Sequence, residues 1–335
     1  MNKNKQRQFA LFALPVSLLM AVFLATAGWA AEPGTWRAPA RTPNPGSTEP
    51  SDQKPGSVLV HNFFSSDAVR PATADTWLNV TNTHLSEGVR LQLAFINGES
   101  GQVSGYWQEV LPGMTIRLQM SRIDPGVTGY AVIVAVNEDG CPINFNHLIG
   151  SAHIKLATGH TANLNAVGFS ALYHDVLPGC GATTPVNLAF DGINYSQAPE
   201  TLGLDNIVNP AEGIQTLLVV NSLNGNLFTG ITKLGALHGR LHAETGSEIA
   251  FSSEAGAQLQ VRLSDDFPNI TPKFSEWIYP GSSGWMRLTT ANQHAITGAA
   301  ITFHSSTDTA QEYFNGGRNL HHLKLTNAGG LTGLR

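Results

Sequence analysis

Histidine, the side chain that most often binds metal ions in proteins, is plentiful in this sequence, with 12 copies. His238 and His242 fall on one face of a predicted strand, but Arg240 stands between them on that face and would oppose a bound cation. His321 and His322 are neighbours, so a strand would point them to opposite faces. No HExxH or EF-hand pattern occurs. We therefore predict no metal site and no cofactor.

Hydroxyl and carboxylate side chains could form a hydrolase site, which needs either an activated nucleophile or two facing acids. Gly281–Gly284 contains two serines, but its glycine spacing differs from that of a GxSxG nucleophile elbow and fits a turn. Asp265, Asp266 and Glu276 could supply carboxylates, although adjacent acids in a loop are usually solvated. We predict no catalytic residues, and an extracellular hydrolase is the third of three functional hypotheses.

Aromatic side chains in predicted loops are the best candidates for ligand binding. Tyr106 and Trp107 lie near a turn in the first half of the chain, and Trp277, Tyr279 and Trp285 lie in or beside a long predicted loop in the second half. Exposed rings of this kind stack on sugars or anchor a protein partner, since they combine apolar area with a polar group. The alternative is that these rings close the open ends of a hydrophobic core.

The elements that must carry these residues are mainly strands. Apolar and polar residues alternate in Val89–Phe95, Ile116–Met120 and Gln258–Leu263, which is the pattern of strands with one buried face. Tyr130–Val136 is more continuously apolar, as expected of a central strand. Thr161–Tyr173 fits either a strand pair or a short helix. Because turns separate these runs at short intervals, we predict an all-β chain of antiparallel β-sandwiches.

Segments of the first half recur in the second half in the same order. Thr76–Asn82 is echoed by Thr216–Ser222, and Val127–Ile133 is echoed by Ile296–Thr302. Each half is near the size of one sandwich domain. We therefore predict two tandem copies of one β-rich domain.

The predicted organisation has four regions. Residues 1–30 form a signal peptide, residues 31–56 a disordered linker, residues 57–182 the first β-sandwich domain and residues 183–335 the second. The linker contains six prolines among Gly, Ser and Thr, and such a segment cannot bury a core. The second domain carries a long inserted loop at Ser264–Gly284.

The first 30 residues have the layout of a secretory signal peptide. A positively charged start precedes an uncharged apolar stretch, Phe9–Ala27, and the small residues Gly28 and Ala30 precede the predicted cut. The alternative is an uncleaved anchor, because the apolar stretch approaches the ~20 residues that span a bilayer. We expect a secreted protein, in the extracellular space, at the cell surface or in the periplasm, with no membrane insertion after cleavage.

The charge balance bears on the class of partner. Without the three basic residues of the signal segment, 16 Lys and Arg stand against 24 Asp and Glu, a formal net charge of −8. Nucleic-acid binding depends on clustered Lys and Arg, so we predict no nucleic-acid partner. No basic amphipathic segment indicates binding to a membrane surface.

The two cysteines of the chain, Cys141 and Cys180, both lie in the predicted mature protein. An even number of cysteines in an oxidising compartment favours a disulfide. This bond would tie the last segment of the first domain back to its sheet. The alternative is a pair of free, buried thiols.

Several turn and strand motifs follow one another along the chain: Leu111–Ile116, Asp124–Tyr130, Val220–Ser222, Leu259–Leu263 and Gly284–Leu288. In their order they resemble a loose class of uncharacterised bacterial secreted proteins with tandem Ig-like β-sandwich domains. The resemblance covers most of residues 57–330 and implies an Ig-like fold and a surface location. It brings no catalytic residues, since a shared fold does not fix function.

The leading functional hypothesis is a secreted or cell-surface structural or adhesive protein without catalytic activity. Its expected partner is a surface protein or a second copy of itself, because exposed sheet edges are natural places for strand addition. The second hypothesis is a carbohydrate-binding module that uses the loop aromatics, with a glycan as partner.

Overall fold

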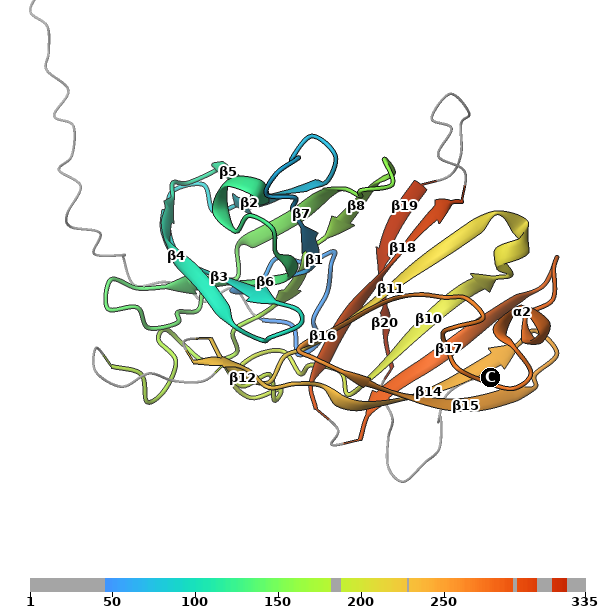
Figure 1. Ribbon diagram of the computed structural model, residues 1–335. Coiled ribbons are helices and arrows are strands. Elements are labelled where there is room, and N and C mark those ends of the chain that lie inside the picture. The colour runs from blue at the N-terminus through green and yellow to red at the C-terminus, as the bar shows by residue number, and fades with distance from the viewer. Residues whose placement is uncertain (1–45, 182–187, 228, 292–293, 306–314, 324–335) are drawn as a thin grey trace, which may run out of the picture. The chain divides into compact units, whose positions relative to one another are not determined.

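The computed structural model describes residues 46–181, 188–227, 229–291, 294–305 and 315–323 (Figure 1). This part of the chain consists mainly of strands in antiparallel sheets. The predicted all-β, antiparallel fold class is thereby confirmed. The predicted signal peptide lies outside the described residues, as does the linker up to residue 45.

Two sheets are built from the first half of the chain. One has the strand order β4-β3-β6-β1-β9 and the other the order β5-β2-β7-β8. The strands of the five-stranded sheet span, in that order, Val103–Val110, Val89–Asn97, Thr128–Val136, Val58–Ser65 and Val167–Phe169. Those of the four-stranded sheet span Thr115–Gln119, Asp75–Asn82, Leu148–Lys155 and Thr161–Asn165.

Two further sheets are built from the second half. The five-stranded sheet has the order β15-β14-β17-β10-β20 and the four-stranded sheet the order β16-β11-β18-β19. The strands of the five-stranded sheet span, in that order, Glu248–Ala255, Gly235–Ala243, Ser283–Thr290, Thr201–Val208 and His321–His322. Those of the four-stranded sheet span Gln258–Arg262, Ile214–Ser222, Ile296–His304 and Asn315–Asn319. The short elements are the β12–β13 pair (Gly225–Asn226, Gly230–Ile231), α1 (Met120–Ile123), α2 (Phe274–Trp277) and a 3₁₀ turn at Pro210–Glu212.

The strand order of the second pair of sheets repeats that of the first once β12–β13 is set aside. Each strand from β1 to β9 then has an equivalent in β10, β11 and β14 to β20, taken in chain order. β1 and β10 also share an irregularity in their pairing, between His61 and Phe64 and between Leu204 and Ile207. This common bulge fixes which residues occupy equivalent positions in the two halves.

One of the two sequence echoes agrees with this equivalence and the other does not. Thr76–Asn82 and Thr216–Ser222 lie in β2 and β11, which are equivalent strands. Val127–Ile133 runs into β6, whereas Ile296–Thr302 lies in β18, the equivalent of β7. The second echo is therefore wrong as a positional match. A Thr-Gly followed by apolar residues suits any strand that is buried on both faces.

Burial along the strands follows the sequence pattern. Leu91, Leu93 and Phe95 of β3 lie in the core between the two sheets of the first half. Tyr130–Val136 in β6 is buried throughout, as predicted for a central strand. Thr161–Tyr173 contains β8 and β9, which resolves its ambiguity in favour of strands.

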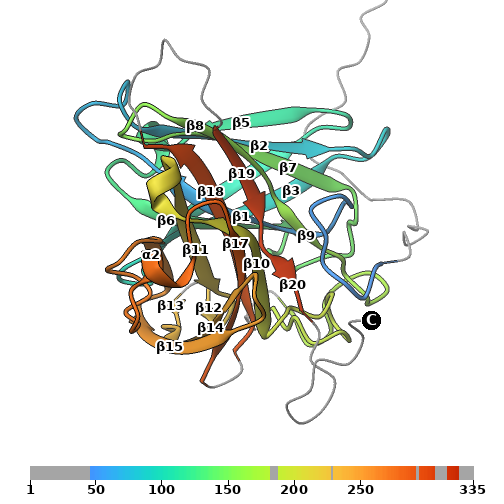
Figure 2. The same ribbon diagram turned by 90° about the vertical axis from the view of Figure 1, so that its right-hand side faces the viewer.

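The central strands β11 and β18 of the sheet β16-β11-β18-β19 are buried on both faces, and this sheet joins the two halves. Leu218 and Val220 of β11 lie in the core of the second half. Leu217 and Val219, on the opposite face of the same strand, belong to the core of the first half. The strands β8 and β19 lie side by side across this junction (Figures 1 and 2). The two halves therefore share apolar core instead of meeting at a solvated linker.

A buried amide in the bulge of β1 organises the polar part of this junction. The Asn62 Nδ2 group donates to the Gly298 carbonyl at 3.0 Å and to Asn319 Oδ1 at 2.7 Å. The Asn62 Oδ1 atom accepts from Asn221 Nδ2 at 3.1 Å and from Thr297 Oγ1 at 2.9 Å. Each of these bonds crosses from the first half to the second, so Asn62 ties the halves together in one arrangement.

The outer face of the sheet β4-β3-β6-β1-β9 is covered by the chain itself. Residues 170–181 and 188–198, which we call the cover segment, place Tyr173 and Tyr195 on this face, and the two hydroxyls share a hydrogen bond of 2.6 Å. A disulfide between Cys141 and Cys180 holds the cover segment to the loop after β6. The predicted disulfide pairing is confirmed.

The end of the predicted linker is ordered in the fold. The Ser51 amide donates to the Gly168 carbonyl at 3.0 Å and the Gly168 amide to the Ser51 carbonyl at 2.8 Å, next to β9. The Gln197 amide in the cover segment donates to the Thr48 carbonyl at 2.9 Å. The prediction of disorder is therefore wrong for residues 46–56. The composition of this stretch indicated that it has no core of its own. Composition could not reveal that the rest of the fold forms hydrogen bonds with its backbone.

Candidate interaction face

The second five-stranded sheet has an outer face that the described residues leave open over β14, β15 and β17, whereas Leu323 packs over Gly203 of β10. Along β14 and β17, buried residues that face the core alternate with exposed or half-buried residues that face away from it. The equivalent face of the first half lies under the cover segment. We call the uncovered surface the open face and define it by His238, Arg240 and His242 of β14, Trp285, Arg287 and Thr289 of β17, and Glu248, Ala250 and Ser252 of β15.

Strand register identifies what the first half carries at the same positions. Counted from the shared bulge, Val132 of β6 is equivalent to Arg287 of β17. Their partners on the neighbouring strands are Ala94 on β3 and Arg240 on β14. Val132 and Ala94 are buried at 4% and 2% exposure. Two arginines thus replace two buried apolar residues, so an apolar segment of the kind that covers the first half would not suit the open face.

Arg240 and Arg287 stand directly opposite each other across β14 and β17. The β-carbons of such a pair lie about 5 Å apart, and like charges in this position destabilise a sheet. Arg240 forms an ion pair with Glu248. The Arg287 side chain is half-buried, and its guanidinium makes no hydrogen bond or ion pair with any residue in the described ranges. The open face therefore holds a guanidinium whose charge the fold does not neutralise.

An aromatic stack lies one pair further along the same two strands. The rings of His242 and Trp285 are nearly parallel, with centroids 4.1 Å apart and 4° between their planes. Burial lowers the pKa of His242; the charge of Glu248 opposes this shift, and the charges of Arg287 and Arg240 add to it. The imidazole is accordingly neutral at pH 7. An uncharged aromatic pair, in which one face of each ring covers the other, thus lies beside the two arginines.

The arrangement suits binding of an anionic ligand with flat apolar surface. A guanidinium offers a planar fork of donors that matches carboxylate, sulfate or phosphate oxygens. Aromatic faces provide apolar area with a defined orientation. His238 and Thr289, the next pair along the strands, add hydrogen-bonding groups on the other side of the arginines.

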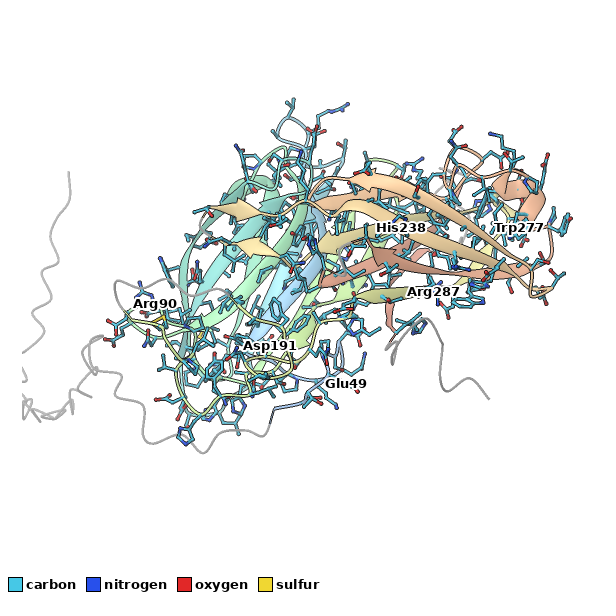
Figure 3. All side chains as sticks on the ribbon, turned by 90° about the horizontal axis from the view of Figure 1, so that it is seen from below. Glu49, Arg90, Asp191, His238, Trp277 and Arg287 are labelled. Carbon is cyan, nitrogen blue, oxygen red and sulfur yellow. A yellow bond between two sulfur atoms is a disulfide. The ribbon has the colours of Figure 1, made fainter. Side chains whose placement is uncertain are left out.

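The predicted aromatic candidates of the second half separate into three environments. Trp285 lies on the open face. Trp277 is the last residue of α2, packs against the core of the second half, and keeps its Nε1 atom buried without a partner in the described part of the chain. Tyr279 is 63% exposed in the loop that follows. Figure 3 shows His238 and Arg287 on the strands of the sheet and Trp277 beside α2.

The predicted candidates of the first half do not form a common platform. Tyr106 and Trp107 lie inside β4, the edge strand of its sheet, and not near a turn. As neighbours on a strand they point to opposite faces. Tyr106 packs near Phe95, with ring centroids 6.2 Å apart, while the Arg90 guanidinium lies 4.9 Å from the centre of the Trp107 ring.

The Asp265 and Ser282 side chains, both considered for catalysis, make local structural contacts. The carboxylate of Asp265 accepts hydrogen bonds from the Ser275 amide at 2.8 Å and its hydroxyl at 2.9 Å, and these bonds lower the Asp265 pKa. Ser282 donates from its hydroxyl to the Tyr279 carbonyl at 2.8 Å, within the predicted turn. Across the described ranges, no three His, Cys, Asp or Glu side chains gather closely enough to hold a metal ion.

A groove of about 470 Å³ lies between the two halves and is a weaker candidate. Its apolar lining includes Phe63 and Phe303, and its charged residues include Asp67 and Arg262. Both charges are already engaged. Asp67 accepts two backbone hydrogen bonds, and the Arg262 guanidinium lies over the Phe303 ring at 5.4 Å.

Comparisons with known proteins do not assign the chain to a family. No family model matches it, and no curated protein matches it. Solved structures with some similarity include Thermotoga maritima 1070 (9% identity, TM-score 0.27, covering 36% of this chain and 97% of that one). A lectin from Pleurotus ostreatus in complex with GalNAc is 11% identical, with a TM-score of 0.18 over 83% of this chain and 85% of the lectin. These scores are too low to support an argument about function.

No helix in the described part of the chain is both long and apolar enough to cross a membrane.

Four of the nine residues that define the open face were named from the sequence. Sequence reasoning placed Arg240 between His238 and His242 on one strand face, and Trp285 among the ligand candidates, but it did not single out Arg287. The signal was present in Trp285–Thr289, where polar and apolar residues alternate with an arginine at the centre of the polar set. The pairing of that arginine with Arg240 depends on strand register, which the sequence does not show.

Proposed function

We propose that this protein is an exported, non-catalytic interaction protein of the adhesive or structural kind, built from two tandem Ig-like sandwich domains. It holds its partner at or outside the cell surface through the open face. The disulfide between Cys141 and Cys180 is compatible with an oxidising compartment such as the extracellular space.

This proposal rests on a difference between two equivalent sheet faces: the chain covers one of them and leaves the other exposed. In the first half the face is apolar and the chain covers it. In the second half the same positions carry arginine, histidine and tryptophan, and the described chain leaves them open. A directly opposed arginine pair costs stability. Its presence on an open face is most simply explained by a partner that supplies the opposite charge.

Strand addition at a sheet edge is a second way to bind a protein partner. β4 and β15 are terminal strands in their sheets. β4 carries Tyr106 and Trp107 at 39% and 40% exposure. An unpaired edge of this kind can accept a strand from a partner or from another copy. This route serves the same adhesive role without the open face.

Carbohydrate binding is the second candidate function, and the stack of His242 and Trp285 favours it. An aromatic platform beside hydrogen-bonding side chains suits a pyranose ring, which has one apolar face and a polar rim. The two candidates overlap if the surface partner is itself a glycan.

The proposed function can be tested on the full-length chain expressed in a bacterium with its N-terminal segment intact. We expect the protein outside the cytoplasm, with the disulfide formed, and co-eluting with envelope material in gel filtration. The Arg240→Ala/Arg287→Val variant should elute as a free monomer. The control variant Arg117→Ala/Arg122→Ala removes two exposed arginines of the first half and should behave like wild type.

Two results would overturn the proposal. One is a wild-type protein that stays in the cytoplasm with reduced cysteines. The other is a wild-type protein that elutes as a monomer with nothing bound.

A further inference from the structure

The geometry points to an acidic polysaccharide as the ligand of the open face, an inference that rests on the proposed function above. The relevant chemistry is a linear chain of sugar rings that carry carboxylate or sulfate groups. Three rows of side chains across β14 and β17 carry this inference: His242 with Trp285, Arg240 with Arg287, and His238 with Thr289.

The order of these rows matches the chemistry of a charged sugar chain. Outward residues on one strand follow each other at about 7 Å, because each residue advances a strand by about 3.4 Å. A polymer lying along the strands would therefore meet a stacking row, a cationic row and a hydrogen-bonding row in succession. The face is an open sheet surface and not an enclosed pocket, so it can accept the middle of a long chain.

The cationic row explains why the sugar must be acidic. Arg287 is half-buried and unpaired within the described chain, and Arg240 stands directly opposite it. A carboxylate or sulfate placed between the two guanidinium groups would accept hydrogen bonds from both and relieve their repulsion. The mature chain has a formal net charge of −8, so this cationic site is a local feature and not part of a generally basic surface.

Other occupants fit these observations less well. A second copy docked on the same face would bring four arginines together. Nucleic acid needs an extended basic surface, whereas this face offers two arginines in an acidic chain. A protein partner normally buries an apolar cluster at the centre of its interface, and Trp285 and Ala250 are the only apolar side chains among the residues that define this face.

Glu248 limits the strength of the site and offers a sharp test. Its carboxylate forms an ion pair with Arg240 and lies 3.7 Å from the His242 ring nitrogen. It therefore competes with an incoming anion for the Arg240 guanidinium. Removing its charge with Glu248→Gln should strengthen binding of an acidic ligand and leave binding of a neutral one unchanged.

The experiment uses affinity electrophoresis of the purified full chain through gels that contain polygalacturonate, dextran or DNA. We expect retardation by polygalacturonate alone, with release as salt is raised, because exposed charge pairs are screened. Arg240→Ala/Arg287→Val should weaken retention at least about tenfold, since each hydrogen bond to a charged group contributes strongly. These replacements copy Ala94 and Val132, which occupy the equivalent positions in the first half.

Controls separate ligand recognition from general electrostatics and from misfolding. Arg117→Ala/Arg122→Ala should retain wild-type binding, and Glu248→Gln should bind more tightly than wild type. Every variant should keep the wild-type circular dichroism spectrum and melting temperature to within a few degrees. Trp285→Ala should reduce retention without changing its dependence on salt.

The possible outcomes separate a failure of the proposed ligand from a failure of the proposed interaction function. Equal retention by dextran or DNA, or retention that survives Arg240→Ala/Arg287→Val, would overturn the acidic-polysaccharide assignment. A second result would be that the variant loses its association with the envelope although polygalacturonate does not retain even the wild type. This result would refute the acidic polysaccharide as ligand but would still support an interaction role for the open face. If the variant associates with the envelope as wild type does, then the open face is not the binding surface, and both the proposed function of this face and its proposed ligand are wrong.

Discussion

His61 should make this protein sensitive to mild acid. It lies in β1 with 1% of its surface exposed, and neither ring nitrogen has a hydrogen-bond partner among the described residues. Its ring packs on Gly150 of β7 so closely that a β-carbon there would lie 3.0 Å from it. Burial lowers the pKa of His61 from 6.5 to about 4, because the charged imidazolium would lose its hydration without gaining a partner.

The sign and size of the effect follow from linkage. The unfolded chain takes up a proton on this side chain near pH 6.5, whereas the folded chain takes it up near pH 4. Between these values the unfolded state binds more protons, so the free energy of unfolding falls as the pH falls. Each pKa unit corresponds to about 1.4 kcal/mol, so His61 alone should remove about 3 kcal/mol by pH 4. Above pH 6.5 it removes nothing.

The assay is urea denaturation of the full chain at pH 7.0 and pH 4.5, on wild type and on His61→Leu. Leucine suits the site because Leu204 occupies the equivalent position of β10. The variant should lose about 2 to 3 kcal/mol less than wild type between the two pH values. Some sensitivity should remain, since burial also lowers the pKa values of His242 and His322.

An exposed histidine supplies the matched control. His238→Gln should leave the difference between pH 7.0 and pH 4.5 unchanged, because His238 is exposed on the open face. If His61→Leu loses as much stability in acid as wild type does, then the buried imidazole is not the source of the sensitivity. The reasoning from desolvation would then be refuted.

Three further predictions concern stability. Asn62→Ala should destabilise the fold by about 3 kcal/mol in urea denaturation, because it leaves buried partners from the second half without a hydrogen bond; a loss below about 1 kcal/mol would contradict that role. Replacing Cys141 and Cys180 by serine should cost about 4 kcal/mol by the same assay, from a loop with a sequence separation of 39; an unchanged midpoint would show that the bond constrains little. Arg287→Val should leave stability unchanged or raise it by up to about 1 kcal/mol by thermal melting, because it relieves the repulsion with Arg240; clear destabilisation would mean that the pair serves the fold.

Much of the fold was readable from local patterns. Alternation in Val89–Phe95 identified a strand with one face in the core, and the apolar run Tyr130–Val136 identified a strand buried on both faces. The pairing of Cys141 with Cys180 was predicted from their even number and from the expected compartment, and the structure contains it. These predictions succeeded because period-two burial and cysteine pairing depend on neighbours along the chain or on simple counting.

Some predictions failed where the decisive contacts are long-range. Residues 46–56 have the composition of a linker, yet their backbone pairs with β9 and the cover segment. Ile296–Thr302 matched Val127–Ile133 in sequence, but its strand occupies a different place in the sheet order. Strands buried on both faces converge on the same few residue types, so local similarity does not reveal strand position.

The sequence by itself determined that this chain forms antiparallel sheets, where several of its strands fall and which cysteines join, because those properties are set locally or by composition. Only the tertiary structure decided which sheet face is covered and which is open. It also brought Arg240 and Arg287 together, although 47 positions separate them in the sequence. That contact depends on the register between β14 and β17, and register is set by the whole hydrogen-bonded ladder and the core beneath it.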